Sequence, residues 1–139
     1  MDKSNSIMAQ QIGEAASAFE GRRTGHVPKS VSVVLSENTL VITLHEALSP
    51  AERALANSPA GAAQMQELHR QLFAHSADAL RQAIQRITGV EVREAAVEVE
   101  PATGTVVQAF TTGTVVQVFL LAGSAGTEAW SGSASGNSS

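Results

Sequence analysis

The chain has 139 residues, a formal net charge of −4 at pH 7, 43% hydrophobic residues and 16% charged residues. This length fits a single domain with one core, and this composition excludes disordered and fibrous proteins. The acidic balance argues against nucleic acid as the main partner, and the lack of cysteine excludes disulfides, thiol catalysis and cysteine-ligated metal centres.

The sequence also lacks the usual membrane signals. No stretch approaches the roughly 20 apolar residues that span a bilayer. The N-terminal residues contain no uninterrupted apolar run of the kind found in a signal peptide. We therefore expect a soluble cytoplasmic protein without direct membrane insertion, one that reaches the inner membrane only through a protein partner.

Apolar side chains at helical spacing predict a first helix over residues 7–19, which Ser4 or Ser6 would cap and Gly21 would end. Arg22 and Arg23 follow directly. Cations are favoured near the C-terminus of a helix, so both arginines are expected to stabilise the helix end. The alternative is that they form an anion-binding loop.

Alternating apolar residues predict a β-hairpin, with strands over residues 31–35 and 39–44 joined by a short polar turn. His45 and Glu46 follow the second strand. A histidine beside a carboxylate suits acid–base chemistry. Neighbouring strand residues point to opposite faces, however, so these two side chains need not meet.

A short helix is predicted after Leu48, because Ser49 is an N-cap residue, Pro50 suits the first helical position and Glu52 completes a capping box. The residues around Pro59 would end this helix. Residues 61–88 then form one long predicted helix with an apolar stripe, followed by Gly89. In the first turn of this helix, Glu52 would serve the capping box and Arg53 would be a surface charge. The alternative is that Glu52 and Arg53 form a polar surface patch for a partner.

A second β region covers residues 90–100. Val90 and Val92 have the opposite parity to Val97 and Val99, which predicts a bulge or kink near residues 94–96. The polar side of this region is acidic, which is typical of a solvated edge that resists aggregation. Its acidic residues are Glu91, Glu94, Glu98 and Glu100.

The hexapeptide TGTVVQ then occurs twice, at residues 103–108 and 112–117. This repeat predicts two short strands, with a single bulged strand as the alternative. Residues 123–139 are rich in glycine and serine, which predicts a disordered tail or linker. The domain organisation is therefore a single domain over residues 1–122 and a tail over residues 123–139.

These elements predict an α+β fold in the order α-β-β-α-α-β-β. An antiparallel sheet of four or five strands would carry the long helix on one face. The strand sequences are only half apolar, which suits a sheet with one solvated face. A homodimer that covers this open face or an open edge is the expected assembly.

Catalytic and metal-binding motifs are lacking. The four histidines include no pair at the i,i+4 spacing of a helical metal site, and no nucleotide-binding loop or nucleophile motif occurs. We therefore expect no catalytic residue, no cofactor and no metal ion. The candidate contacts for a partner or an anion are Arg22, Arg23, His45, Glu46, Glu52 and Arg53.

Several segments resemble the small bacterial MpsC family over roughly residues 7–122. The matching words are QQIG at residues 10–13, LSPAERAL at 48–55, IQRITGVEV at 84–92 and VFLL at 118–121. The family takes its name from a sodium-translocating, membrane-potential-generating system, and some members are associated with modules for inorganic-carbon uptake. The resemblance implies a non-enzymatic accessory or regulatory subunit of a membrane transport system, and it carries over no catalytic residue.

Two other functions are consistent with the residues. One is a small anion- or metabolite-binding sensor, with an anion near Arg22, Arg23 or the helix start at Ser49. The other is an enzyme that uses His45 and Glu46. The accessory role predicts co-purification with a membrane protein, the sensor predicts stabilisation by its ligand, and the enzyme predicts an activity that His45→Ala abolishes.

Overall fold

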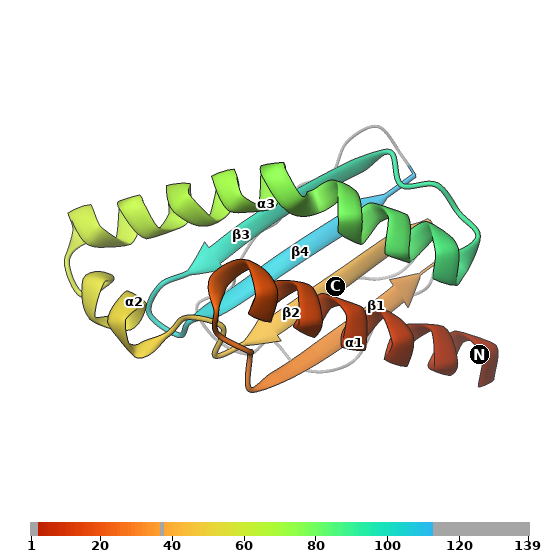
Figure 1. Ribbon diagram of the computed structural model, residues 1–139, viewed down its shortest axis with the longest axis horizontal. Coiled ribbons are helices and arrows are strands. Elements are labelled where there is room, and N and C mark those ends of the chain that lie inside the picture. Colours follow the sequence, from red (N-terminus) through yellow and green to blue (C-terminus); the bar gives the residue numbers. More distant parts are fainter. Residues whose placement is uncertain (1–2, 37, 113–139) are drawn as a thin grey trace, which may run out of the picture.

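The computed structural model describes residues 3–36 and 38–112 and confirms the α+β class. The elements occur in the predicted order (Figure 1). Their bounds are α1 (Lys3–Thr24), β1 (Ser30–Ser36), β2 (Thr39–His45), α2 (Pro50–Leu55), α3 (Pro59–Thr88), β3 (Glu94–Glu100) and β4 (Thr105–Thr111).

The four described strands form one antiparallel sheet in the order β1-β2-β4-β3. The predicted hairpin is confirmed as the β1–β2 pair, in which Val33 lies opposite Ile42. β4 inserts between β2 and β3, so that Gln108 lies opposite both Ile42 and Val97. The sheet order therefore places β1 and β3 at the two edges.

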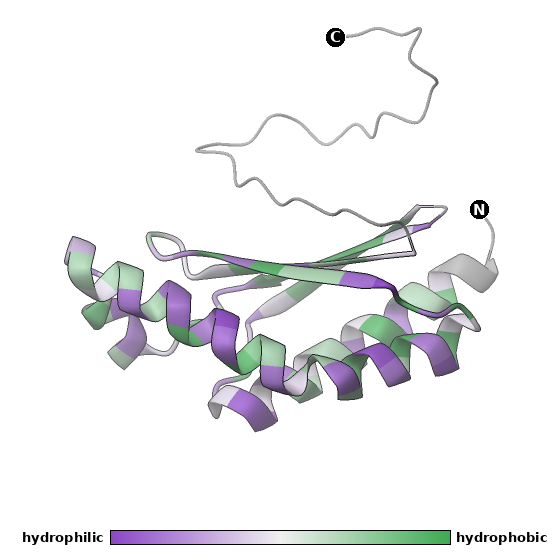
Figure 2. Cartoon of the chain, turned by 90° about the horizontal axis from the view of Figure 1, so that it is seen from above, coloured by the Kyte–Doolittle hydropathy of each residue, from purple (hydrophilic) through white to green (hydrophobic). Residues whose placement is uncertain are grey.

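Helices α1 and α3 lie on the same face of this sheet (Figure 2). α1 packs against β1, β2 and α3, whereas α3 packs against β3 and α1. The core lies between the layers, where the Phe73 ring of α3 meets the Phe110 ring of β4 at 5.9 Å between centroids. Every second residue of β2 is buried in this core, namely Leu40, Ile42 and Leu44.

The end of α1 differs from the prediction. Gly21 lies inside the helix, and Arg22 and Arg23 form its last turn. The helix ends instead at Gly25, whose φ of 79° is left-handed and whose N–H donates to the Gly21 carbonyl at 2.8 Å. A glycine adopts this conformation without steric cost, so the second of the two glycines terminates the helix.

The caps of the other helices agree better with the sequence. The Ser49–Glu52 capping box of α2 is confirmed, with both reciprocal hydrogen bonds present. Ser58 caps α3 by accepting from the Gly61 N–H at 3.0 Å, so α3 begins at Pro59 rather than at residue 61. Gly89 ends α3 with φ 77°, as predicted.

The predicted bulge near residues 94–96 is wrong, because the β3–β4 register runs without interruption from Glu94 to Glu100. Val90 and Val92 precede the strand, so their opposite parity imposes no bulge. The first copy of the repeat supplies β4. The second copy and the Gly/Ser-rich segment, and with them the predicted fifth strand and tail, lie outside the described residues.

Candidate functional site

Five polar side chains from three helices form two groups along α3, one with partners on α1 and one with a partner on α2, and we name them the helix-junction cluster. α1 supplies Glu20 and Arg23, α2 supplies Glu52, and α3 supplies His69 and Ser76. Glu20 and His69 are each only 1% exposed. Polar and ionisable side chains are rarely buried to this extent unless partners stabilise them.

The helical repeat explains why these polar residues are buried. On α1, Glu20 lies four residues after Ala16 and eight after Ile12, both of which are buried in the core. On α3, His69 lies midway between the buried Met65 and Phe73. Residues four apart share one face of a helix, so Glu20 and His69 continue the stripes that face the interior.

The Glu20 carboxylate forms an ion pair with the Arg23 guanidinium, one turn further along α1. The Glu20 side chain is 0% exposed and that of Arg23 is 11% exposed. Arg23 Nη1 also donates to Ser76 Oγ at 3.3 Å, and this hydroxyl donates in turn to the Leu72 carbonyl at 2.6 Å. The pair therefore links the last turn of α1 to the middle of α3.

The second pair joins α2 to α3. His69 Nε2 lies 3.2 Å from Glu52 Oε2. The other oxygen of Glu52 accepts a hydrogen bond from the Ser49 N–H at 2.8 Å, which is one half of the capping box. One carboxylate thus caps the start of α2 and holds the histidine of α3.

Electrostatic interactions connect the two pairs. Burial raises the pKa of Glu20 above its usual 4.5, while Arg23 and His69 lower it by less and Glu52 raises it further. Among the described residues, Glu20 Oε2, Arg23 Nε and His69 Nδ1 are buried polar atoms without a hydrogen-bond partner. Burial therefore favours the protonated form of Glu20 more in the folded protein than in water.

This geometry suits proton binding better than covalent chemistry. The side chains of Glu20 and His69 are both 0% exposed, so a substrate has no access to them in this conformation. Protonation of Glu20 would weaken its attraction to Arg23 but would also remove a buried charge, and the raised pKa means that burial has the larger effect. The protonation of Glu20 is therefore linked to the stability of the fold.

The structure brings two of the six candidate contacts, Arg23 and Glu52, into this cluster. Arg22 turns the other way, with its guanidinium 4.7 Å from the centre of the Phe19 ring. Arg53 donates to the Ala102 carbonyl at 3.2 Å and so supports the turn between β3 and β4. Arg22 and Arg23 therefore have different partners and do not converge on one anion.

His45 and Glu46 have separate partners. His45 Nε2 lies 3.1 Å from Ser32 Oγ on β1. Glu46 has a positive φ of 51°, and its carboxylate lies 3.7 Å from Lys29 Nζ at the surface. None of these interactions joins His45 to Glu46, as the alternation of strand side chains suggested.

Sequence reasoning did not single out Glu20, His69 or Ser76. The available signal was position: a glutamate and a histidine each continue an apolar i,i+4 stripe, where a polar residue is costly without a partner. The i,i+3 spacing of Glu20 and Arg23 was a second signal, since such residues are neighbours on a helix. Which helix carries the partner of His69 depends on the tertiary fold.

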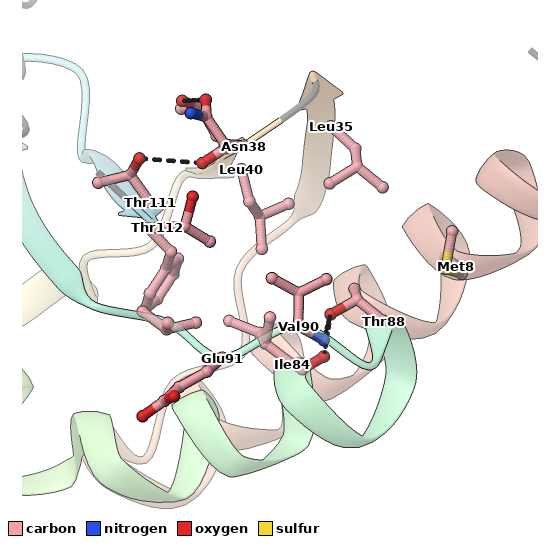
Figure 3. Close-up of a pocket in the computed structure, with 13 residues that line it drawn as sticks. Met8, Leu35, Asn38, Leu40, Ile84, Thr88, Val90, Glu91, Thr111 and Thr112 are labelled. Carbon is pink, nitrogen blue, oxygen red and sulfur yellow. Dashed lines mark hydrogen bonds between the residues drawn. The ribbon is translucent and has the colours of Figure 1, made fainter.

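A separate pocket of about 240 Å³ opens at the far end of α3. Leu35, Leu40 and Ile84 contribute apolar walls, and the Thr111 hydroxyl donates to the Asn38 carbonyl at 2.9 Å beside them (Figure 3). None of the described residues that line this pocket is basic. Its walls therefore suit an apolar or uncharged group better than an anion.

Residues 3–36 and 38–112 contain neither a candidate metal site nor a candidate membrane span. No group of three histidine, aspartate or glutamate side chains is placed to hold a metal ion there. None of the helices in this part of the chain combines the length and the apolar character needed to cross a bilayer.

The fold and the cluster define a small α+β protein in which two helices cover one face of a four-stranded antiparallel sheet and enclose a titratable polar cluster. The family model for MpsC, described as the Na⁺-translocating membrane potential-generating system (MpsC), matches residues 4–114. The chain belongs to the MpsC family. Neither the curated proteins nor the solved structures contain a significant match to it.

Proposed function

We propose that this protein is a non-enzymatic accessory or regulatory subunit of a membrane system that transports ions or inorganic carbon. Membership of the MpsC family carries this proposal, because the family is described by a Na⁺-translocating, membrane-potential-generating system. The chain would act by contact with a transporter subunit in the membrane.

The geometry of the titratable residues supports a regulatory role over a catalytic one. Glu20 and His69 are enclosed, whereas a general acid or base must reach its substrate within hydrogen-bond distance. His45 and Glu46 are accessible but are bound to different neighbours. A cluster that links three helices is suited to changing their packing, which a partner could sense.

Co-purification tests this function directly. We expect the tagged full-length chain, extracted from membranes of its native host in mild detergent, to recover a polytopic transporter subunit identified by mass spectrometry. Deletion of its gene should lower the Na⁺-dependent membrane potential or the uptake of inorganic carbon. Recovery of the chain alone, with both activities unchanged in the deletion strain, would contradict the accessory role.

A matched variant separates the accessory role from the enzyme. His45→Ala should restore transport in the deletion strain as well as the unmodified chain does, because the accessory role does not use the imidazole. A variant that still co-purifies with the transporter and yet fails to restore transport would favour catalysis by His45.

The pocket beside Ile84 favours a metabolite sensor as the second candidate. Its described walls lack a basic side chain, so we expect uncharged metabolites, rather than bicarbonate or phosphate, to raise the melting temperature. Val90→Trp is the matched variant, because Val90 lines the pocket and is 50% exposed, so a larger side chain can be accommodated. Stabilisation that persists in this variant would exclude the pocket as the sensor site.

A further inference from the structure

Within the described residues, strand β3 has a neighbouring strand on one side only. It pairs with β4 alone in the described sheet, at the end of the order β1-β2-β4-β3. Gln66, a residue of α3, donates from Nε2 to the Val99 carbonyl at 3.1 Å. The backbone carbonyl of Val99 therefore points to the open side of the strand. Since the direction alternates along a strand, the backbone groups of Ala95 and Val97 point to the same side.

A groove runs between this open edge and helix α3. Its β3 wall is formed by residues 95–98, and its α3 wall includes Phe73, Ala74 and Ala77 between Arg70 and Arg81. Small side chains on both walls leave room beside the strand. The buried Nε of Arg81 has no hydrogen-bond partner among the described residues. In the described sheet, the edge therefore combines backbone groups without a strand partner with a partly apolar recess, the arrangement used in β-strand addition.

The opposite side of the same edge is acidic. Val97 and Val99 are buried beneath the helices, so Glu94, Glu98 and Glu100 point to the helix-free face. Arg70 of α3 reaches round the edge to within 3.6 Å of Glu98, and Glu94 remains exposed. A strand added here would place alternate side chains over the groove and beside the glutamates.

A second copy of β3 is a poor occupant of this edge. In an antiparallel β3–β3 pair centred on Val97, Glu94 of each copy would face Glu100 of the other, on one face of the joined sheet. Like charges opposite one another destabilise a strand pair. The acidic side therefore disfavours self-pairing and favours a strand with basic side chains at alternate positions.

We propose that the β3 edge binds an extended segment of a partner protein by strand addition. This segment has lysine or arginine at alternate positions, facing Glu94 and Glu98, and small or apolar residues between them, facing Phe73 and Ala77. The proposal is independent of whether the partner is a transporter, because the strand, the groove and the charges define it.

Two synthetic peptides test the charge pattern on the full chain. The first is acetyl-Lys-Val-Lys-Ala-Lys-Val-Lys-amide, and the second carries glutamate in place of each lysine. We expect the lysine peptide to bind and to shift the amide NMR signals of Ala95 and Val97, and the glutamate peptide not to bind. Equal binding of both peptides, or shifts confined to another surface, would overturn the proposal.

Variants test the two parts of the surface. Glu94→Gln with Glu98→Gln should weaken binding by about tenfold, because each cross-strand charge pair contributes up to about 1 kcal/mol. The matched control, Glu14→Gln with Glu46→Gln, removes the same charge from residues outside β3 and should bind normally. Ala95→Pro removes an edge N–H, a change that edge strands tolerate, and should abolish the NMR shifts.

The oligomeric state provides the remaining test. If the unmodified chain forms a dimer that Ala95→Pro dissociates, a second copy occupies the edge and the proposal is wrong. Unchanged peptide binding in Ala95→Pro, with the fold confirmed by circular dichroism, would overturn it as well.

Discussion

At the scale of single residues, Glu20 is an ionisable side chain whose pKa is clearly shifted by its surroundings. Burial is the main reason that its pKa is raised, and the attraction of Arg23 and His69 offsets only part of this effect. The folded protein therefore binds a proton on Glu20 more tightly than the unfolded chain does. Ionisation of Glu20 at higher pH consequently favours the unfolded state.

The variant Glu20→Gln tests this sign. It keeps the shape of the side chain and cannot ionise, so the stability of the original protein relative to the variant should fall as the pH rises above 4.5 and through the raised pKa. Urea unfolding of both proteins between pH 4.5 and 8 measures this difference. A relative stability that increases over this range would mean that the ion pair with Arg23 outweighs burial.

His69 tests the packing of the cluster. His69→Ala should destabilise the fold by about 2–4 kcal/mol, because it opens a cavity and removes the buried partner of Glu52. His75→Ala on the same helix is the control and should cost less than about 0.5 kcal/mol, since His75 is exposed. Equal losses in chemical denaturation would show that the position of His69 has no special importance.

At the scale of the helices and strands, the turn between α2 and α3 is set by the close approach of two backbones. Gly61 is buried in the first turn of α3, and an added Cβ would clash with the Leu55 carbonyl oxygen. Backbone atoms of a capped helix end move less easily than a side chain. A glycine is therefore required at residue 61 for steric reasons rather than for its backbone angles.

Gly61→Ala should consequently cost at least about 2 kcal/mol, in spite of the better helix propensity of alanine. Gly89→Ala is the matched control, because a Cβ there meets nothing within 4 Å and the cost arises only from the positive φ of 77°. We expect about 1 kcal/mol for the control. Thermal unfolding of the two variants would contradict this account if Gly89→Ala were the more damaging.

At the scale of the whole molecule, both helices lie on one side of the sheet and the other face is without a helix in the described part of the chain (Figure 2). Val34 of β1 is on this face and is 57% exposed. If the chain forms the homodimer expected from the sequence, we expect Val34 to lie at its contact, because an exposed apolar side chain on a sheet face favours association.

Val34→Asp should therefore give a monomer in light scattering at concentrations where the unmodified chain is a dimer. Val27→Asp is the matched control, because Val27 is 62% exposed and lies in the loop before β1. A dimer that resists Val34→Asp, or one that Val27→Asp dissociates equally, would place the contact elsewhere.

The sequence by itself determined the features that depend on neighbouring residues. The capping box of Ser49 and Glu52, the end of α3 at Gly89, the hairpin alternation and the order of the elements were all predictable, because hydrogen bonds and side-chain periodicity within a few residues specify them. The words that resemble the MpsC family were likewise present in the chain, and the family match over residues 4–114 confirms the family, although the word at residues 118–121 lies outside the match.

Only the tertiary structure decided what those elements bring together. The insertion of β4 between β2 and β3 leaves β3 at an edge, and the packing of α1 on α3 encloses Glu20 and His69 with Arg23 and Glu52. The sequence shows that Glu20 and His69 are polar residues on apolar helix stripes, but it does not identify their partners. Contacts between residues tens of positions apart depend on how whole helices pack, which local propensity does not encode.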